Sequence, residues 1–120
     1  MDNKKEYILC AAIKRIAPKF EKDTMYYNND LNNIEIGYRH HDILQRFHGE
    51  VSKRLKDQGF YTSKGTFVDR IDAMFIAWKA EQVTTEVAFG ANYDYVSTIL
   101  NADDYVLLQY CYPLYSEDLY

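Results

Sequence analysis

Residues 37–48 read GYRHHDILQRFH, and this short stretch concentrates side chains that could do chemistry. It holds two arginines, three histidines and one aspartate. Histidine titrates close to neutral pH, and arginine binds carboxylates and phosphates through a planar fork of donors. Four interpretations follow: a catalytic acid/base pair, a metal site, an anion site at the start of a helix, and the polar face of a helix.

A metal site fits the spacing of the histidines poorly. Zinc needs three or four converging ligands, typically spaced as C-x₂-C or H-E-x₂-H. On a helix the neighbours His40 and His41 would diverge by about 100°, and His48 would lie about two turns from His41. We therefore expect neither a bound metal nor any other cofactor.

The serines and cysteines do not form a recognisable nucleophile. No serine lies in a G-x-S-x-G elbow, and no P-loop or G-x-G-x-x-G motif is present. Cys10 and Cys111 lie in apolar runs, which disfavour a thiolate. A histidine oriented by Asp42 is the remaining catalytic alternative, although sequence neighbours rarely face each other in this way. We expect a binding protein rather than an enzyme.

Anion binding makes the fullest use of the arginine and the histidines. If a strand that ends near Arg39 turns directly into a helix, then Arg39, His40 and His41 stand beside free backbone N–H groups and the positive end of the helix dipole. Such a turn binds phosphate, and the arginine adds a bidentate contact. The alternative is that Arg39 pairs with a surface acid such as Asp42.

Two further groups of residues complete a candidate nucleotide site. They are Thr62, Ser63 and Lys64 in a predicted hairpin, and Phe89, Asn92 and Asp94 in the stretch FGANYDY. The hairpin would cover a second phosphate or a ribose, although exposed turns favour the same polar composition. In FGANYDY the aromatic ring would stack on a base, the amide would read its edge, and the aspartate would accept ribose hydroxyls. The alternative is that this second stretch is an ordinary loop.

Composition and charge narrow the class of partner. The chain has 120 residues, 48% hydrophobic and 27% charged, which suits one domain spanning 1–120. Its net charge of −4 is the sum of 0 over residues 1–38, +3 over 39–79 and −7 over 80–120. An acidic C-terminal third repels polymeric DNA or RNA, so we expect no such partner. A small anion held by the middle third remains compatible with this distribution.

Cysteine usage and apolar runs bear on the compartment. The two cysteines and the absence of a signal peptide indicate a reducing cytoplasm, with a disulfide between them as the alternative. The longest apolar run is far shorter than a membrane span, so we expect no contact with membranes.

Alternation of apolar residues predicts the strands. The run YILCAAI, residues 7–13, is apolar throughout and predicts a central strand covered on both faces. IEIGYR, residues 34–39, alternates, which predicts a strand with Ile34, Ile36 and Tyr38 facing the core. GFYTSKGTFV predicts a hairpin that turns at Lys64 and Gly65. Residues 20–33 are rich in Asn and Asp and predict a loop or a weak edge hairpin.

Helical spacing predicts two helices. One spans residues 41–58 and ends at Gly59, with an apolar stripe of Ile43, Leu44, Phe47, Val51 and Leu55. The other is capped by Asp69 and buries Ile71, Met74, Phe75 and Trp78. Residues 93–112 suit either a strand or a buried helix. The fold class is α+β, a small, mainly antiparallel β-sheet with about two α-helices packed on it.

Four stretches, in this order, carry a family resemblance: EYILCAAI, IEIGYRHHDI, QGFYTSKGTFVDRIDAMFIAWKAEQV and LYSEDLY. They resemble the first type of phage Thoeris anti-defence protein, which sequesters the cyclic ADP-ribose isomer made by bacterial TIR enzymes. The resemblance covers roughly the whole chain. The chain departs from the family pattern in the short strand before Arg39 and in a longer extension over residues 83–112.

The resemblance implies a symmetric homo-oligomer, dimeric or built from dimers, in the host bacterial cytoplasm. It implies a pocket that binds glycocyclic ADP-ribose without cleaving it, and some members also hold cyclic oligonucleotides at a second site. Arg39, His40 and His41 match the family's arginine-histidine turn, while Phe60, Thr62 and Ser63 match its hairpin.

Two other functions compete with sequestration of a nucleotide signal. One is a small enzyme that hydrolyses a cyclic nucleotide with a histidine base, and the other is a protein inhibitor of a host effector. Twelve tyrosines and several apolar segments indicate sticky surface, consistent with a homo-oligomer. We expect the C-terminal YPLYSEDLY, with Tyr115, Leu119 and Tyr120 as anchors, to form its interface, with an acidic disordered tail as the alternative.

Overall fold

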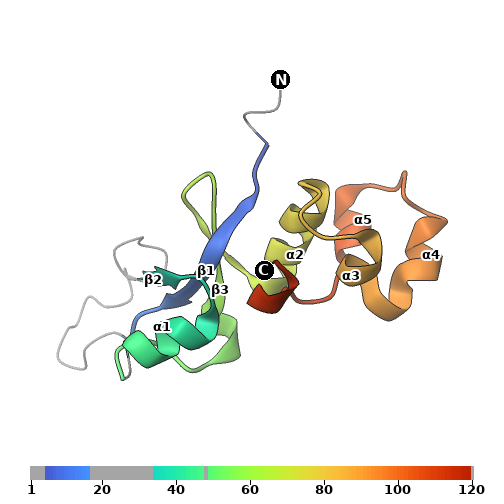
Figure 1. Ribbon diagram of the computed structural model, residues 1–120. Helices are drawn as coiled ribbons and strands as arrows, with labels where there is room; N and C mark the ends of the chain where they lie inside the picture. The colour runs from blue at the N-terminus through green and yellow to red at the C-terminus, as the bar shows by residue number, and fades with distance from the viewer. Residues whose placement is uncertain (1–4, 17–33, 48, 120) are drawn as a thin grey trace.

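Four strands and five α-helices make up the computed structural model, which describes residues 5–16, 34–47 and 49–119 (Figure 1). The strands are β1 (Ile8–Lys14), β2 (Ile34–Gly37), β3 (Gln58–Thr62) and β4 (Phe67–Asp69). The α-helices are α1 (His40–Arg46), α2 (Arg70–Lys79), α3 (Thr85–Phe89), α4 (Tyr93–Ser97) and α5 (Asp104–Leu108). Short 3₁₀ turns are η3 (Leu55–Asp57), η4 (Gly90–Asn92) and η5 (Ser116–Asp118).

The strands form one antiparallel sheet in the order β2-β1-β3-β4. The predicted central strand is confirmed, because β1 pairs with β2 on one side and β3 on the other. Ala11, Ala12 and Ile13 are fully buried, so both faces of β1 are covered there. Tyr7 and Leu9, at its beginning, are exposed, and the prediction of burial along its whole length is wrong at these two residues.

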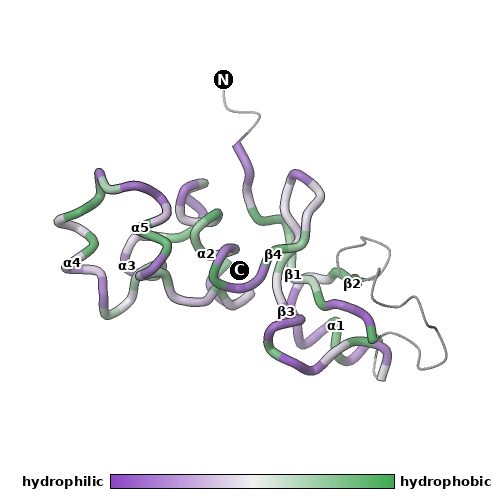
Figure 2. The backbone as a smooth tube through the Cα atoms, turned by 180° about the vertical axis from the view of Figure 1, so that it is seen from behind, coloured by the Kyte–Doolittle hydropathy of each residue, from purple (hydrophilic) through white to green (hydrophobic). Residues whose placement is uncertain are grey.

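Two helices, α1 and α2, pack on the sheet, which confirms the predicted α+β fold class. Helices α3, α4 and α5 lie beyond α2, on the side away from β2, in both views of the chain (Figures 1 and 2). One core joins the two parts, because Phe60 of the sheet and Phe89, Val96 and Leu107 of the outer helices belong to the same buried cluster.

The predicted helix over 41–58 is wrong beyond Arg46, where α1 ends. Gly49 has a left-handed backbone, φ +81°, which a continuing helix does not allow. Val51 then forms a bridge with Arg15, at the end of β1, and is buried, while Leu55 is exposed. The apolar spacing that predicted a long helix is therefore shared between a short helix and an extended segment held by long-range pairing.

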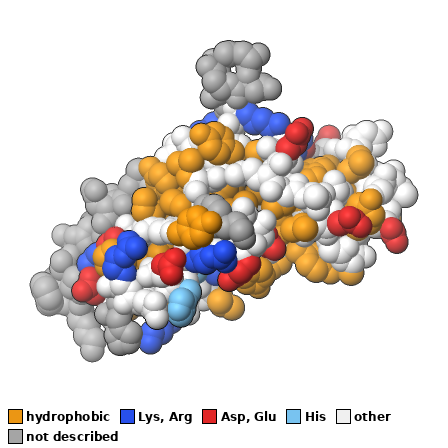
Figure 3. Space-filling view, in the orientation of Figure 1, with side chains coloured by type: hydrophobic (Ala, Val, Ile, Leu, Met, Phe, Trp, Pro, Cys, Tyr) orange, Lys and Arg blue, Asp and Glu red, His pale blue; other side chains and the backbone are white. Residues whose placement is uncertain are grey.

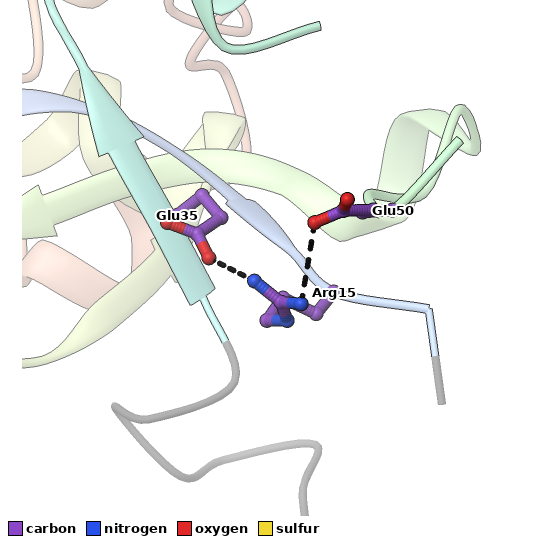
Figure 4. Close-up of polar contacts among 3 residues, drawn as sticks. All are labelled: Arg15, Glu35 and Glu50. Carbon is purple, nitrogen blue, oxygen red and sulfur yellow. Dashed lines mark hydrogen bonds and ion pairs between the residues drawn. The ribbon is translucent and has the colours of Figure 1, made fainter. Parts of the chain in front are cut away.

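Arg15 strengthens this arrangement at the end of β1 (Figure 4). Its guanidinium donates to Glu35 of β2 and, at 3.4 Å, to Glu50 beside the bridge. The segment after α1 is thus tied to the two strands that precede it.

Three apolar residues lie on a different face from the one predicted. Ile36 and Tyr38 are 46% and 55% exposed, and Ile71 is exposed as well, so the predictions that they face the core are wrong. In α2 the predicted Met74 is buried, Ala73 and Ala77 are buried as well, and the predicted Phe75 and Trp78 are half-buried beside them. Small alanines let α2 approach the sheet closely, and the larger side chains lie at its margins.

Gly59 lies in β3 and does not end a helix as predicted. A Cβ atom at this position would stand 2.0 Å from the carbonyl oxygen of Val68 in β4. The glycine is therefore required by the close approach of two strands. The predicted hairpin between β3 and β4 is confirmed by their pairing, with Gly65 of the turn at φ +79°.

The cap of α2 is as predicted, because Asp69 Oδ1 accepts the N–H of Asp72 at 2.8 Å. The ambiguous stretch 93–112 is helical, forming α4 and α5. The loop expected over 20–33 lies outside the described residues. Within the described part of the chain, no helix is long and apolar enough to cross a membrane.

Both cysteines are free. Burial, together with the charge of Asp72, raises the pKa of Cys111 to about 12, and burial raises that of Cys10, partly offset by a backbone hydrogen bond from Gly37. Both side chains are therefore protonated thiols at neutral pH.

Candidate functional site

The arginine-histidine turn lies where β2 passes into α1. Arg39 is the N-cap residue, with extended backbone at φ −133° and ψ 154°, and its side chain makes no cap hydrogen bond. Its guanidinium carbon lies 5.5 Å from the ring centroid of Tyr38. Because α1 has only seven residues, its dipole adds little, and the positive charge here comes from side chains.

His40 points inward from the same turn. It is 6% exposed, its Nε2 lies 2.7 Å from the carbonyl oxygen of Gly59, and its ring meets the edge of Phe60 at 4.9 Å. Burial, and secondly the charge of Arg70, lower its pKa from 6.5 to about 4, against the opposing effects of the Gly59 bond and Glu117. His40 is therefore neutral at pH 7 and donates through Nε2, while its neighbour His41 is exposed.

Arg70, which sequence reasoning did not select, supplies a second guanidinium. It donates to the carbonyl oxygen of Leu114 at 2.9 Å and to Gln58 Oε1 at 3.2 Å, and it lies 4.8 Å from the ring of Tyr115. Its Nε is buried and has no hydrogen-bond partner among the described residues. Burial lowers its pKa, whereas Tyr115 and Glu117 raise it, and the group stays charged at neutral pH.

Glu117 of the C-terminal turn η5 is an acid that interacts electrostatically with both arginines. Its carboxylate lies 3.8 Å from Arg39 Nη1, and its charge acts on Arg70 and His40. We refer to Arg39, His40, Arg70, Tyr115 and Glu117 as the basic cluster. Figure 3 shows Lys or Arg, Asp or Glu, and a histidine side chain gathered together in the lower left of the face in view.

The alternative for Arg39, an ion pair with a surface acid such as Asp42, is met by a different acid, Glu117, 78 positions further along the chain. The cluster carries two positive charges against one exposed negative charge, since His40 is neutral. It can therefore bind an anion that competes with the Glu117 carboxylate.

The predicted hairpin residues lie elsewhere and hold the turn together. Thr62 is fully buried, and its Oγ1 bonds Thr66 Oγ1 at 2.9 Å and accepts the N–H of Lys64 at 3.2 Å. Ser63 Oγ accepts the N–H of Tyr7 at 3.0 Å, while the Lys64 side chain is exposed. These contacts match the alternative of an ordinary polar turn.

The predicted base-binding residues lie in the outer helices. Phe89 is fully buried against Trp78, with ring centroids 4.8 Å apart, so its face is not available for stacking. Asn92 donates to the carbonyl oxygen of Tyr110 at 3.1 Å, and Asp94 is exposed. Phe60 is likewise a core residue, 0% exposed.

The structure therefore brings only part of the predicted set together. Arg39, His40 and Phe60 are contiguous, while the hairpin turn and the helices α3 and α4 lie in two other parts of the molecule (Figure 1). No group of three or more His, Cys, Asp or Glu side chains in the described ranges is placed to hold a metal ion.

Comparison with known proteins identifies the family of this chain. A family model described as the phage T4 y16D protein matches residues 7–120. The chain belongs to this family. The T4 y16D assignment makes it a phage protein and extends over nearly the whole chain, so the sheet, the basic cluster and the outer helices are all parts of the family's domain. No curated protein and no solved structure matches.

One local signal could have revealed Arg70. Acidic residues are favoured in the first turn of a helix, and a basic residue directly after the cap Asp69 opposes the helix dipole. A basic residue at this position therefore indicates partners outside its own helix. For Arg70 these partners are Leu114, Tyr115 and Glu117 of the C-terminal segment. Nothing local in the sequence marks these partners.

Proposed function

We propose that this phage protein binds and withholds an anionic nucleotide second messenger in the cytoplasm of the host bacterium. The signal proposed is glycocyclic ADP-ribose, the cyclic ADP-ribose isomer of Thoeris immunity, with cyclic oligonucleotides as further ligands. The basic cluster is the proposed contact for its phosphates.

One observation carries this proposal: the arginines of two different elements converge on a single exposed carboxylate. Arg39 comes from the turn before α1 and Arg70 from the first turn of α2, and both interact with Glu117. The side chain of Glu117 is 71% exposed, and an exposed ion pair of 3.8 Å contributes about 0–1 kcal/mol. A phosphate, with more charge and more acceptor oxygens, is expected to replace it.

Binding without cleavage is the form of this proposal that the chemistry favours. A general base needs a ring nitrogen with a pKa near the working pH and access to the substrate. His40 has neither, because its pKa is lowered to about 4 and its Nε2 is engaged by Gly59. The proposed role of His40 is to position the turn that carries Arg39.

Calorimetry with glycocyclic ADP-ribose tests the contact. Arg39→Ala removes one charge-assisted bond, so affinity should fall about ten- to a hundredfold, or about 1.5–3 kcal/mol. Arg39→Lys should recover only part of this, since it keeps the charge and loses the planar fork. Arg46→Ala, an equal change of charge at the exposed end of the same helix, is the matched control and should bind as the wild type does.

Three outcomes separate the competing functions. Equal affinity in a folded Arg39→Ala variant would move the phosphate site away from the basic cluster. Ligand recovered intact after incubation and heat denaturation supports sequestration, whereas altered ligand would identify an enzyme. Affinity that stays level between about pH 7 and 8 is expected when phosphate and arginine carry the binding.

A homo-oligomer is also part of the proposal, and the sheet offers a second candidate surface beside the predicted C-terminal one. Of the predicted C-terminal anchors, Tyr115 is 50% exposed, Leu119 packs partly against the chain's own core, and Tyr120 lies outside the described residues. The exposed apolar residues Leu9, Ile36 and Tyr38 of β1 and the β2 edge offer a further surface for a second copy. Native mass spectrometry of the wild type and Ile36→Glu would detect the loss of such an assembly.

A further inference from the structure

An open groove of about 360 Å³ is lined in part by Asp118 of the C-terminal turn, the residue that follows Glu117. It is formed by the end of α2, the loop to α3 and η5, and its walls include Trp78, Glu81, Thr84 and Asp118. Its volume lies within the range of small-molecule sites. The basic cluster and this groove share the turn η5 and helix α2, whose first residue, Arg70, belongs to the cluster and whose Trp78 lines the groove.

The side-chain N–H donors of Trp78 and Gln82 in the wall of the groove are already engaged. Trp78 Nε1 donates to Thr85 Oγ1 at 3.0 Å, and the amide of Gln82 bonds both the N–H and the C=O of Ile8. By contrast, no described residue donates a hydrogen bond to the carboxylate of Glu81. No Lys or Arg lines the groove, but Lys79 Nζ lies 5.9 Å from the ring centroid of Trp78, so the indole already faces one cation of the chain itself.

The surroundings add to this negative character. Residues 80–120 contain no Lys or Arg and seven acids. Figure 3 shows acidic and no basic side chains at the right-hand end of the face in view, over the outer helices. An anion is disfavoured in such a field, and a cation is attracted to it.

Glu81 occupies a backbone position that glycine suits better. Its φ is +63°, the sole positive φ of a non-glycine residue in the described ranges. The N–H groups of Glu81 and Gln82 bond the carbonyls of Trp78 and Ala77, the pattern of a Schellman motif, in which this position is usually glycine. A carboxylate is thus kept at the rim of the groove at some cost in stability.

We infer that this groove binds an organic cation, with a guanidinium group as the best match. A planar guanidinium can replace Lys79 Nζ over the indole of Trp78 and donate two bonds to one carboxylate. A second positive charge on the same molecule would meet the other acid, Asp118. This site is separate from the proposed nucleotide site, which takes a ligand of the opposite charge.

Trp78 makes the test direct, because it is the single tryptophan of the chain and lies in the groove. Its fluorescence should change saturably when agmatine, which carries a guanidinium and an amine, is added to the full-length protein. Calorimetry repeats the titration, because it detects binding even if the fluorescence of Trp78 does not change. Glu81→Gln should weaken binding about tenfold, as expected for one charge-assisted hydrogen bond.

Two controls separate the groove from general effects of charge and folding. Glu86→Gln removes an exposed acid of α3 that lies outside the groove and should bind as the wild type does. Glu81→Gly removes the carboxylate and relaxes the backbone, so a loss of binding in this variant cannot result from unfolding. Arg39→Ala should leave agmatine binding unchanged, so this inference and the proposed nucleotide function can fail independently.

The source of the cation is distinguished by a second ligand, N-acetylarginine amide, which has the guanidinium without the amine. Tighter binding of agmatine supports a free polyamine, which is the result we expect, and tighter binding of the amide supports an arginine presented by a protein. No saturable signal from either ligand by about 10 mM in both measurements, or equal affinity in Glu81→Gln, would overturn the inference.

Discussion

The two sides of the C-terminal turn differ in charge although they are neighbours in the fold. Glu117 lies against the arginines of the basic cluster, and Asp118, the next residue, lines the acidic groove. The turn before α1 and the first turn of α2 bring the positive charge, while all charged residues after α2 are acids. One short turn thus separates two fields of opposite sign, and each can select a different class of ligand.

The contrast between the basic cluster and the acidic groove depends most on Leu114, because this residue anchors the C-terminal segment that carries the turn η5. It is 0% exposed, and its N–H donates to the carbonyl oxygen of Arg70 at 2.9 Å. Leu114→Ala should lower the free energy of unfolding by about 2–5 kcal/mol through the cavity it leaves. Urea denaturation measures this, and Leu100→Ala, at a 49% exposed leucine, should change it by less than about 0.5 kcal/mol.

If the turn separates the two fields, Leu114→Ala should weaken both ligands at once. A variant that lost one ligand and kept the other at full affinity would show that the two sites do not share this anchor.

The basic side should respond to acid through His40. The unfolded chain binds a proton near pH 6.5, whereas the folded chain does so only near pH 4, so the contribution of His40 is complete above pH 6.5 and is lost as pH falls toward 4. At about 1.4 kcal/mol per pH unit, the loss between pH 7 and 4 is about 3 kcal/mol. Urea melts at several pH values should show this loss for the wild type and not for His40→Gln.

The matched control for this pH dependence is His41→Gln, which changes the exposed neighbour. It should retain the wild-type slope. The same slope in His40→Gln would mean that carboxylates, and not this histidine, set the acid stability.

On the acidic side we expect a smaller effect of the opposite sign, a gain in the free energy of unfolding. Glu81→Gly places glycine at φ +63° and should raise the free energy of unfolding by about 1 kcal/mol. Glu86→Gly makes the same replacement within the helix α3, where it should lower stability by about 1 kcal/mol. A destabilised Glu81→Gly protein would contradict the strain assigned to this position.

Local signals in the sequence determined how much of the fold could be predicted. Helix α2 was predicted because its cap Asp69 and its apolar spacing lie within a dozen residues of one another. The hairpin of β3 and β4 was predicted for the same reason. The helix at 41–58 failed because its second half, around Val51, pairs with Arg15, a contact that periodicity within one segment cannot reveal.

The candidate site shows the same limit. Arg39 and His40 stood out by their type and spacing, but whether each faces solvent or core depended on Gly59 and Phe60 in another strand. The contact of Arg39 with Glu117 joins opposite ends of the chain. Sequence reasoning can name residues with the right chemistry, and only long-range packing decides which of them meet.

Gln82 has a consequence for the way the sheet is assembled. Near Ile8, where the pairing of β1 with β2 has not yet begun, its amide bonds both backbone groups that an additional strand would otherwise use. One side chain therefore shields an open edge from pairing with another chain. Because the two residues are 74 positions apart, this protection requires that α2 and its following loop have docked, and the edge of β1 is open to pairing with another chain until that contact forms.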